Sequence, residues 1–224
     1  MGKIILDKAY VGSSEVDKIY LGTELVYQSQ KGIPIEEAPS GVYILRTDNL
    51  LYTQDDWDTS WNEESVGVAV LSSDCKFVIS KIQGDKMKWG GEDVIISGVI
   101  STSEVDTAKT DYAGKDNTDK IIDQLGASNA PAANYCKNTI GLFPDGRQGY
   151  LGAFGEWQKA YDYKSYLDSC LSTIGGDAIA TDECHLSSTQ SSRSDYVWVL
   201  YWGWNQTATN SKKRDYRVRA FAAL

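Results

Sequence analysis

Segments typical of β-strands lie at both ends of this chain, and segments typical of helices lie between them. The strand-like segments before the helices are rich in β-branched and aromatic residues and are bounded by turn formers: 41–53, 65–81 and 93–102. Helical spacing of apolar residues follows between 114 and 176, and strand patterns return from about residue 187. Because strands and helices do not alternate as βαβ units, this order predicts an α+β fold.

The strongest helical pattern is GEWQKAYDYKSYLDSCLSTIGG, residues 155–176. Apolar residues recur there at steps of three and four, so they line one face of a single helix: Ala160, Tyr163, Leu167, Cys170 and Ile174. Gly175 and Gly176 are expected to end this helix. A shorter helix is predicted over 114–126, with Asn117 or Thr118 as its N-cap, and one or two helical turns over 129–138.

The first 36 residues are predicted to form a β module and a linker. The sequence VDKIYLGTELVY, residues 16–27, contains two β-prone runs around Gly22-Thr23, which indicates a hairpin. Both faces of this hairpin are apolar, so it is expected to pack on the main domain or on copies of itself. The polar stretch 28–41 carries two of the four prolines and is typical of a linker. We predict an anchoring or oligomerisation module over 1–36 and one domain over 37–224.

The charge balance disfavours several classes of partner. The 224 residues carry a formal net charge of −9, and 42% of them are hydrophobic, so a folded core is expected. Nucleic-acid binding needs clustered Lys and Arg, and an acidic chain is a poor match for it, so no nucleic acid partner is predicted. No run of 18 apolar residues could span a bilayer, and the N-terminus does not resemble a signal peptide. We predict no membrane insertion.

The residues that carry most metal and acyl-transfer chemistry are sparse. His185 is the single histidine, and the cysteines are dispersed, with no C-x-x-C pair: Cys75, Cys136, Cys170 and Cys184. Zinc needs closely paired ligands, so the cysteines are interpreted as small buried hydrophobes, and a disulfide stays open. Ser187 and Ser188 beside His185 lack the G-x-S-x-G context of a hydrolase nucleophile. We predict no metal, no cofactor and no enzymatic activity.

An acidic stretch, 52–64, offers oxygen ligands from Asp and Glu side chains. Calcium needs six or more converging oxygens, and the spacing of an EF-hand is absent here. We interpret the stretch as a solvated loop in which Trp57 and Trp61 turn inward. Calcium binding stays open as an alternative, and so does a carboxylate pair for glycoside hydrolysis, since the sequence gives no separation between the side chains.

The segment SSTQSSRSDYVWVLYWGWNQ, residues 187–206, joins polar stretches to an aromatic strand. Side chains alternate between the two faces of a strand, so Trp198, Leu200 and Trp202 share one face, and Val199 and Tyr201 share the other. The tryptophan face is predicted to be the core, because large aromatic rings bury much area. Val199 and Tyr201 are then expected to point outward beside a rigid aromatic floor. The pattern alone also fits an ordinary edge strand with a polar loop.

Three stretches, taken in order, resemble one protein family. They are TDYAGKDNTDKIIDQLG at 110–126, GYLGAFGEWQKAY at 149–161, and the C-terminal set SSTQ, VWVLYWGWNQ and YRVRAFAAL. Together they resemble the variable proteins of diversity-generating retroelements, of the type carried by gut bacteria and their phages. The resemblance covers roughly residues 41–224 and implies a C-type-lectin-like fold of the branch shared with formylglycine-generating enzymes. The N-terminal hairpin is similar to small β modules at the front of phage structural proteins.

The resemblance implies that adenine-directed mutagenesis rewrites a C-terminal variable region, about 187–224. Asn codons altered at their adenines can encode Ser, Arg, Asp, Tyr, Val, Thr or Ala, among others, but not Trp, Lys, Gln, Glu or Met. We call the residue types that such altered codons can encode adenine-reachable. Residues of these types are predicted to form the ligand-binding surface: Ser191, Ser192, Arg193, Ser194, Asp195, Tyr196, Val199, Tyr201, Thr207, Thr209, Asn210, Ser211, Arg214 and Asp215. Residues of the unreachable types are predicted to be fixed scaffold: Trp198, Trp202, Trp204, Gln206, Lys212 and Lys213.

Other positions in the matching stretches have predicted structural roles. Glu156 and Trp157 open the long helix, where a carboxylate favours the helix dipole and the ring packs inward. Arg217 and Arg219 point to the same side and are predicted scaffold residues that pair with buried carboxylates. Leu200 joins the tryptophans in the scaffold.

The chain also departs from its relatives at several positions. An aromatic residue is common where this chain has Leu186, just before SSTQ, and a proline is common where it has Gly152. No cysteine follows Cys184, so the copper-dependent oxidase activity of the related branch is not implied.

We therefore predict a protein that binds ligands non-covalently through a diversified surface. Tyr196 and Tyr201 are expected to be stiff aromatic anchors, and Ser, Thr and Asn adaptable hydrogen-bonding groups. Four charged side chains would determine which charges on a partner are preferred: Arg193, Asp195, Arg214 and Asp215. The predicted partner is a protein or glycan on a bacterial surface, met by a phage tail or a cell-surface adhesin, with a homotrimer multiplying weak contacts. The alternatives are a formylglycine-generating-like or carbohydrate-active enzyme and a purely structural virion protein.

Overall fold

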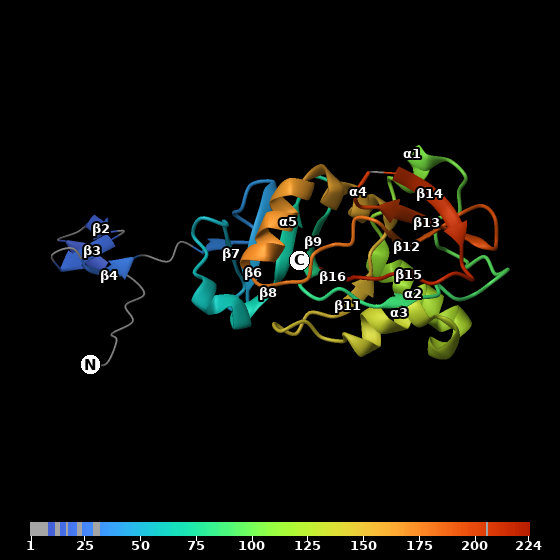
Figure 1. Ribbon diagram of the computed structural model, residues 1–224, viewed down its shortest axis with the longest axis horizontal. Coiled ribbons are helices and arrows are strands. Elements are labelled where there is room, and N and C mark those ends of the chain that lie inside the picture. Colours follow the sequence, from blue (N-terminus) through green and yellow to red (C-terminus); the bar gives the residue numbers. More distant parts are fainter. Residues whose placement is uncertain (1–8, 12–13, 17, 22–23, 29–31, 205) are drawn as a thin grey trace.

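Strands β6, β8 and β9 form between residues 41 and 80 because β-branched and aromatic side chains dominate that part of the chain. The structure is a computed structural model and describes residues 9–11, 14–16, 18–21, 24–28, 32–204 and 206–224. Helices lie against separate, largely antiparallel sheets (Figure 1). The predicted mixture of helix and sheet without βαβ repeats is confirmed.

The larger sheet has seven strands in the order β11-β16-β9-β8-β6-β7-β5. Their bounds are β5 Ile33–Pro34, β6 Gly41–Arg46, β7 Leu50–Tyr52, β8 Ser65–Leu71, β9 Lys76–Ser80, β11 Gly149–Leu151 and β16 Ala220–Ala223. Every residue of β8 is buried, so both faces of the centre of this sheet are covered. The C-terminal β16 inserts between β9 and β11, where Ala222 pairs with Val78 and with Gly149. The last residues of the chain therefore join its first long strands to the helical region.

The smaller sheet has five strands in the order β10-β15-β12-β13-β14. Their bounds are β10 Lys86–Met87, β12 Cys184–Gln190, β13 Tyr196–Tyr201, β14 Gln206–Ser211 and β15 Tyr216–Arg217. Strands β12, β13 and β14 follow one another as antiparallel neighbours, and β14 is the edge strand. After β14 the chain crosses to the other side of β12, where β15 pairs beside His185.

The helices pack between and around these sheets. Their bounds are α1 Val105–Ala108, α2 Gly114–Leu125, α3 Pro131–Asn134, a π-helical turn Tyr135–Thr139, α4 Phe154–Asp162 and α5 Lys164–Thr173, with short 3-10 turns at Thr59–Glu64 and Ala127–Asn129. The predicted single helix over 155–176 is wrong, because the helix breaks at Tyr163, which has φ −109° and ψ 19°. The break lets α4 pack on β12 and β13 while α5 packs on β6 and β8 of the other sheet.

Two further expectations are corrected. Helix α2 begins at Gly114, so Asn117 and Thr118 lie inside it and are buried, not at its cap. The segment 93–102 is not a strand, although Ser101 forms a single bridge with Gln190. Part of its backbone bonds to a side chain instead, since Gln190 Oε1 accepts from Ile96 N at 2.9 Å and Gln190 Nε2 donates to Ile96 O at 3.1 Å. The helical turns predicted over 129–138 are confirmed as α3 and the π-helical turn.

The core divides into two buried clusters. One contains most of the large rings, among them Trp157, Trp198, Trp202 and Phe221, and runs along α4 and α5 from the small sheet to the large sheet. The other is mainly aliphatic and includes Val199, Leu186 and Trp89. In the acidic loop Trp57 is buried, and Trp61 is half-buried against it with ring centroids 5.6 Å apart, so the predicted inward turn of these rings is confirmed.

The N-terminal segment contains two small two-stranded sheets, β1 Ala9–Val11 with β2 Ser14–Val16, and β3 Lys18–Leu21 with β4 Glu24–Gln28. They lie at one end of the chain in space, beyond β5 and β7 (Figure 1). The predicted pairing of β3 with β4 is confirmed, while its turn, Gly22-Thr23, lies outside the described residues. The division into a module over 1–36 and a domain over 37–224 stays a prediction.

Candidate ligand-binding surface

The predicted variable residues gather on β13, on the edge strand β14 and on the turns beside them. Of the fourteen, only Ser191 and Val199 are buried, which leaves twelve that are exposed or half-buried. We call these twelve, together with Trp204 and Tyr216, the β13–β14 surface. The small sheet thus brings most of the predicted positions together on one edge of the molecule.

Val199 does not point outward as predicted, because both faces of β13 are covered. It has no exposed surface and belongs to the aliphatic cluster with Ile96 and Val99 from the segment that follows β10. Ser191 is also buried, and its hydroxyl accepts from Arg193 N at 3.2 Å. Strand alternation predicts an outward Val199 only if a single face of β13 meets the core, and here both faces do.

The turn between β12 and β13 presents a charged and aromatic group. The guanidinium of Arg193 lies over the ring of Tyr196, 3.7 Å from its centroid, and pairs with Asp195 at 3.1 Å. Asp195 O accepts from Lys212 N at 2.9 Å, which ties this turn to the end of β14. Arg193 is exposed, so this group can offer a cation, a carboxylate and a ring face to a partner.

The opposite end of the surface is an aromatic group around Tyr201. The rings of Tyr201 and Trp204 lie 6.1 Å apart, and Asn210 donates to Cys184 Sγ at 3.4 Å on the same face of the sheet. A hydrogen bond with Cys184, followed by burial, raises the pKa of Tyr201, and burial raises the pKa of Tyr216. The positive charge of Arg214 acts on both tyrosines and opposes these two rises in pKa. Both hydroxyls therefore stay neutral donors near neutral pH.

Two residues of this group were not predicted as binding residues. Trp204 was predicted as fixed scaffold, and it is 65% exposed because it lies in the turn after β13 and no longer follows the strand alternation. Tyr216 was not named, although tyrosine is one of the reachable types. Of the other predicted fixed residues, Trp198, Trp202 and Lys212 are buried, while Gln206 and Lys213 are exposed.

Strand β14 divides its side chains between two faces. Thr207, Thr209 and Ser211 pair opposite Leu200, Trp198 and Tyr196, and they are half-buried. Asn210 and Gln206 share the face of Tyr201. The edge strand therefore exposes small hydrogen-bonding groups on both sides of a backbone that pairs only with β13 in the described chain.

The SSTQ stretch is buried and ties the surface to the rest of the fold. Thr189 donates to Asp111 Oδ2 at 2.7 Å and accepts from Phe154 N at 2.8 Å, while Asn117 donates to the same carboxylate oxygen at 2.9 Å. Ser187 donates to Trp198 O at 2.8 Å, and Trp89 donates to Ser187 O at 2.9 Å. Because each of these groups is buried and bonded, they fix the position of β12 against α2 and α4.

Gln190 and Lys212 hold the segment that covers Val199. Lys212 donates to Val94 O at 2.7 Å and to Gln190 Oε1 at 3.3 Å, and its ammonium lies 4.3 Å from the centroid of Trp89. Burial lowers the pKa of Lys212 to about 8. Lys213 next to it is exposed and pairs with Glu92.

The remaining scaffold predictions are corrected in part. Trp157 is buried as predicted, and its indole donates to Leu186 O at 3.1 Å. Arg217 pairs with Glu183 at 2.6 Å, but that carboxylate is half-exposed. Arg219 is fully buried and donates to backbone carbonyls, at 2.7 Å to Asp177 O, because no carboxylate among the described residues reaches it.

Residues that suggested other chemistry do not form a site. His185 is buried, and burial followed by the charges of Arg219 and Arg217 lowers its pKa to about 3. Ser187 bonds to a backbone carbonyl and not to this ring. Within the described ranges, no three His, Cys, Asp or Glu side chains converge as metal ligands, and all four cysteines are free thiols. No helix of the described residues is long and apolar enough to cross a membrane.

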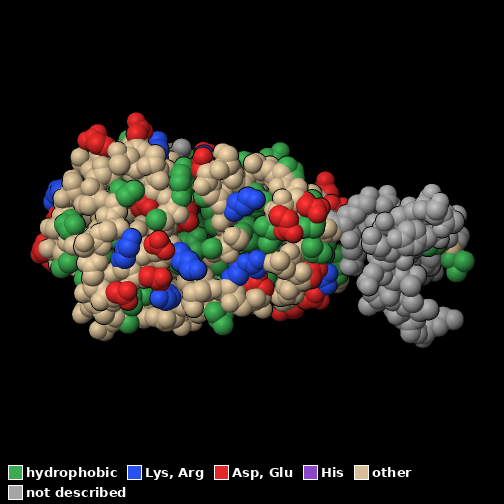
Figure 2. Space-filling view, turned by 180° about the vertical axis from the view of Figure 1, so that it is seen from behind, with side chains coloured by type: hydrophobic (Ala, Val, Ile, Leu, Met, Phe, Trp, Pro, Cys, Tyr) green, Lys and Arg blue, Asp and Glu red, His purple; other side chains and the backbone are tan. Residues whose placement is uncertain are grey.

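Charges on the molecular surface are mixed. Figure 2 shows blue and red side chains interspersed over the described part of one face, with green apolar side chains between them. A face of this kind offers no continuous basic patch of the sort that tracks a phosphate backbone.

Comparison with known proteins shows a similarity of fold and no match of sequence family. No family model matches the chain, and no curated protein matches it. Among solved structures, the chain is similar to a fimbrial protein from Bacteroides ovatus, with a TM-score of 0.62 and 11% identity over 84% of this chain. The chain spans about half of that protein, 49% of its length. At this identity the likeness concerns the fold alone.

Proposed function

We propose that this chain is a ligand-binding protein whose β13–β14 surface recognises a protein or glycan on a bacterial surface. The observation that carries the proposal is the partition of side chains near the C-terminus. Twelve of fourteen adenine-reachable positions are exposed or half-buried, whereas three of the six predicted fixed positions, Trp198, Trp202 and Lys212, are buried. A buried, fully bonded floor under open side chains lets those side chains vary while the fold persists.

The chemistry of the surface supports recognition. Tyr201 and Trp204 supply rigid rings with polar atoms, and such residues dominate binding energy in many interfaces. Arg193 and Asp195 supply charges that can select a partner. The mechanism is non-covalent binding, and we propose no enzymatic activity.

We propose further that the domain is C-type-lectin-like and that the chain is the variable protein of a diversity-generating retroelement. The motif resemblance supports this, because its SSTQ, Trp157 and Trp202 positions are buried parts of the scaffold. The likeness to a fimbrial protein supports a role in adhesion, on a cell surface or on a phage tail. A homotrimer built through the N-terminal strands would add avidity.

A cell-binding experiment tests the recognition surface. The full chain is labelled and its binding to intact gut bacterial cells is measured by flow cytometry. The triple variant Tyr201→Ala, Asn210→Ala, Arg214→Ala is expected to lose at least about tenfold in binding with an unchanged unfolding midpoint. The control Lys115→Ala changes an exposed charge on α2 and is expected to bind like the parent. Equal binding by the triple variant and the parent contradicts the proposal.

The DNA beside the coding sequence tests the retroelement. We expect a reverse transcriptase gene and a near-copy of the 3′ end that differs only at adenines of the template. The differences should fall on the adenine-reachable codons of the β13–β14 surface and not on the codon of Trp204. A flanking region with neither feature would remove the retroelement from the proposal and leave the binding surface standing.

A further inference from the structure

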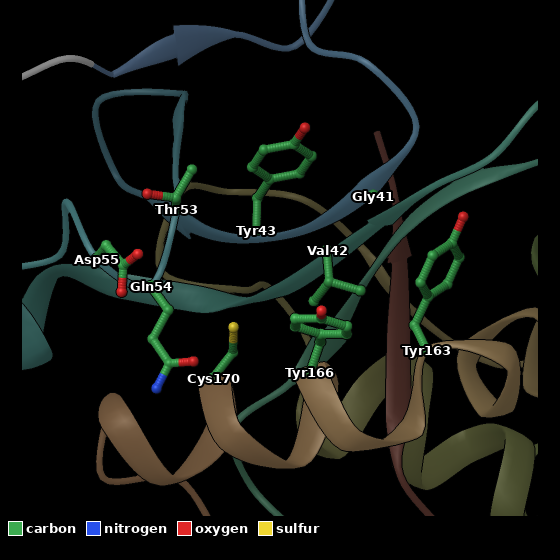
Figure 3. A pocket seen from close by; sticks show the side chains of 9 residues that line it. All are labelled: Gly41, Val42, Tyr43, Thr53, Gln54, Asp55, Tyr163, Tyr166 and Cys170. Atoms are coloured by element: carbon green, nitrogen blue, oxygen red, sulfur yellow. The ribbon is translucent and has the colours of Figure 1, made fainter.

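A recess lies away from the β13–β14 surface, between α5 and the start of β6 (Figure 3). Its volume is about 370 Å³, within the range of about 300–1,000 Å³ that small-ligand sites occupy. It is lined by Gly41, Val42, Tyr43, Thr53, Gln54, Asp55, Tyr163, Tyr166 and Cys170.

Tyr163 and Tyr166 form the helical wall of the recess, whereas Tyr43 is buried and its ring points away from α5 (Figure 3). Tyr43 comes from β6, Tyr166 from α5, and Tyr163 from the break between α4 and α5. Figure 3 shows Tyr163 and Tyr166 rising from the helical side toward the strand that carries Tyr43 and Val42. Tyr166 is 70% exposed, an unusual fraction for a large ring, and its exposed face is open to a ligand. The break at Tyr163 thus builds one wall of the recess.

Polar groups without partners stand around these rings. Among the described residues, no hydrogen bond or ion pair engages the Asp55 carboxylate or the hydroxyls of Tyr163 and Tyr166. Gln54 donates to Thr173 Oγ1 at 2.9 Å, which leaves its carbonyl oxygen as an acceptor. Asp55, Gln54 and Thr53 lie together at one end of the recess, and Tyr163 and Tyr166 lie toward the other (Figure 3). The recess therefore combines ring faces with both donors and acceptors.

The charges of the residues that line the recess limit the class of ligand that it can bind. None of the nine lining residues is a lysine or arginine, and Asp55 is acidic, so an anionic ligand has no counter-charge here. The Cys170 thiol is a neutral group, because burial raises its pKa to about 11. A purely apolar ligand would leave the carboxylate and the hydroxyls without partners.

We propose that this recess binds a neutral saccharide. The C–H face of a sugar ring would lie on Tyr166 and Tyr163, while its hydroxyls donate to Asp55 and to the Gln54 carbonyl. The site is separate from the β13–β14 surface and does not depend on the function proposed for it. Two sites would give the protein one contact to a common glycan and another to a specific partner.

A glycan array tests this site. The labelled full chain is applied to immobilised neutral oligosaccharides of gluco-, galacto-, manno- and N-acetylglucosamine type, with sialylated and sulfated glycans on the same array. We expect binding to at least one neutral class. Tyr166→Ala and Asp55→Asn are expected to weaken that binding about tenfold each, and both positions are exposed, so folding should persist. Trp204→Ala removes an exposed ring of the other surface and is the matched control, with binding expected unchanged.

Several results would overturn the site. Binding to acidic glycans alone, or to no glycan, contradicts a neutral saccharide. Displacement of a bound neutral glycan by choline chloride would point instead to a cation held by the rings of Tyr163 and Tyr166. Binding that survives Tyr166→Ala but falls with Trp204→Ala would move the sugar to the β13–β14 surface. The cell-binding experiment above uses different variants, so the two proposals can fail separately.

Discussion

At the scale of single residues, Glu156 shows how burial changes the role of an acidic side chain. Its carboxyl accepts from Ala153 N at 2.7 Å and from the Tyr150 hydroxyl at 2.8 Å, at the start of α4. The residue is buried, and burial is the main reason that its pKa is raised to about 8. The sequence predicted a carboxylate that favours the helix dipole, whereas the group is mostly protonated at neutral pH.

This pKa predicts how stability depends on pH. Folding raises the pKa of Glu156 from 4.5 to about 8, so the folded state holds an extra proton in that window. The contribution of Glu156 to stability is therefore complete below pH 4.5 and is lost as pH rises toward 8. We expect Glu156→Gln to remove this loss, which is on the order of 5 kcal/mol over the full window. Urea unfolding of the parent and of Glu156→Gln at several pH values measures this loss. If the unfolding free energies of the two proteins changed in parallel with pH, the raised pKa of Glu156 would be contradicted.

Val199 gives a second residue-scale prediction. An adenine-altered Asn codon can encode Asp, so Val199→Asp is a change that diversification would generate. It would bury an unpaired carboxylate in the aliphatic cluster, and we expect a loss of more than about 3 kcal/mol in unfolding free energy. Thr209→Asp places the same charge on the half-buried edge strand and is expected to cost less than about 1 kcal/mol. Chemical denaturation measures the unfolding free energy of both variants. Similar losses in the two would contradict the burial of Val199 and the partial exposure of Thr209.

At the scale of elements, the segment between β10 and α1 is held by side chains in addition to a single β-bridge with Gln190. Gln190 bonds to both backbone groups of Ile96, and Gln124 bonds in the same way to Ser97, at 2.9 and 3.0 Å. Gln190 is buried and Gln124 is exposed. The neighbouring pairs therefore form a matched comparison of one interaction in two environments.

We expect Gln190→Ala to destabilise the protein by about 2–3 kcal/mol, because Ile96 N and Lys212 would lose a buried partner. Gln124→Ala should cost less than about 1 kcal/mol, since water replaces its bonds. Hydrogen exchange at the Ile96 amide should accelerate in the first variant and stay unchanged in the second. Slow exchange at Ile96 in Gln190→Ala would show that other contacts hold this segment.

The elements also show what the sequence could predict. The strands around β8 and the helical character of 155–173 follow from local composition and spacing, so they were predicted well. The break at Tyr163 was not predicted, because it depends on two sheets that face the two halves of the helix. Residues 93–102 have strand composition, yet Gln190 from a distant part of the chain bonds the backbone of Ile96. Likewise, the openness of Trp204 depends on where β13 ends, which alternation does not give.

At the scale of the whole molecule, the two proposed binding sites lie at opposite ends of the main body. The recess beside α5 lies toward the N-terminal strands, and the β13–β14 surface lies at the far side of the small sheet (Figure 1). Residue identities suggested the surface near the C-terminus. They gave no sign of the recess, because its tyrosines come from distant parts of the chain and meet only in the fold.

The state of the cysteines gives a whole-molecule prediction. All four are free, and Cys136, Cys170 and Cys184 are buried. We therefore expect the same thermal midpoint with and without dithiothreitol, because no cross-link constrains the unfolded chain. A thiol assay should detect Cys75 first in the folded protein and four thiols after denaturation. A midpoint that falls in reductant would reveal a disulfide and contradict this expectation.

The burial of Ser191 and Val199 among the predicted variable positions has a practical consequence for protein engineering. A combinatorial library that randomises the exposed codons but keeps these two constant should yield a larger fraction of soluble clones than one that alters every permitted codon. Natural lineages under the same mutagenesis would then discard changes at these two codons, so their apparent diversity would dip there while the codons of the exposed positions stay mixed.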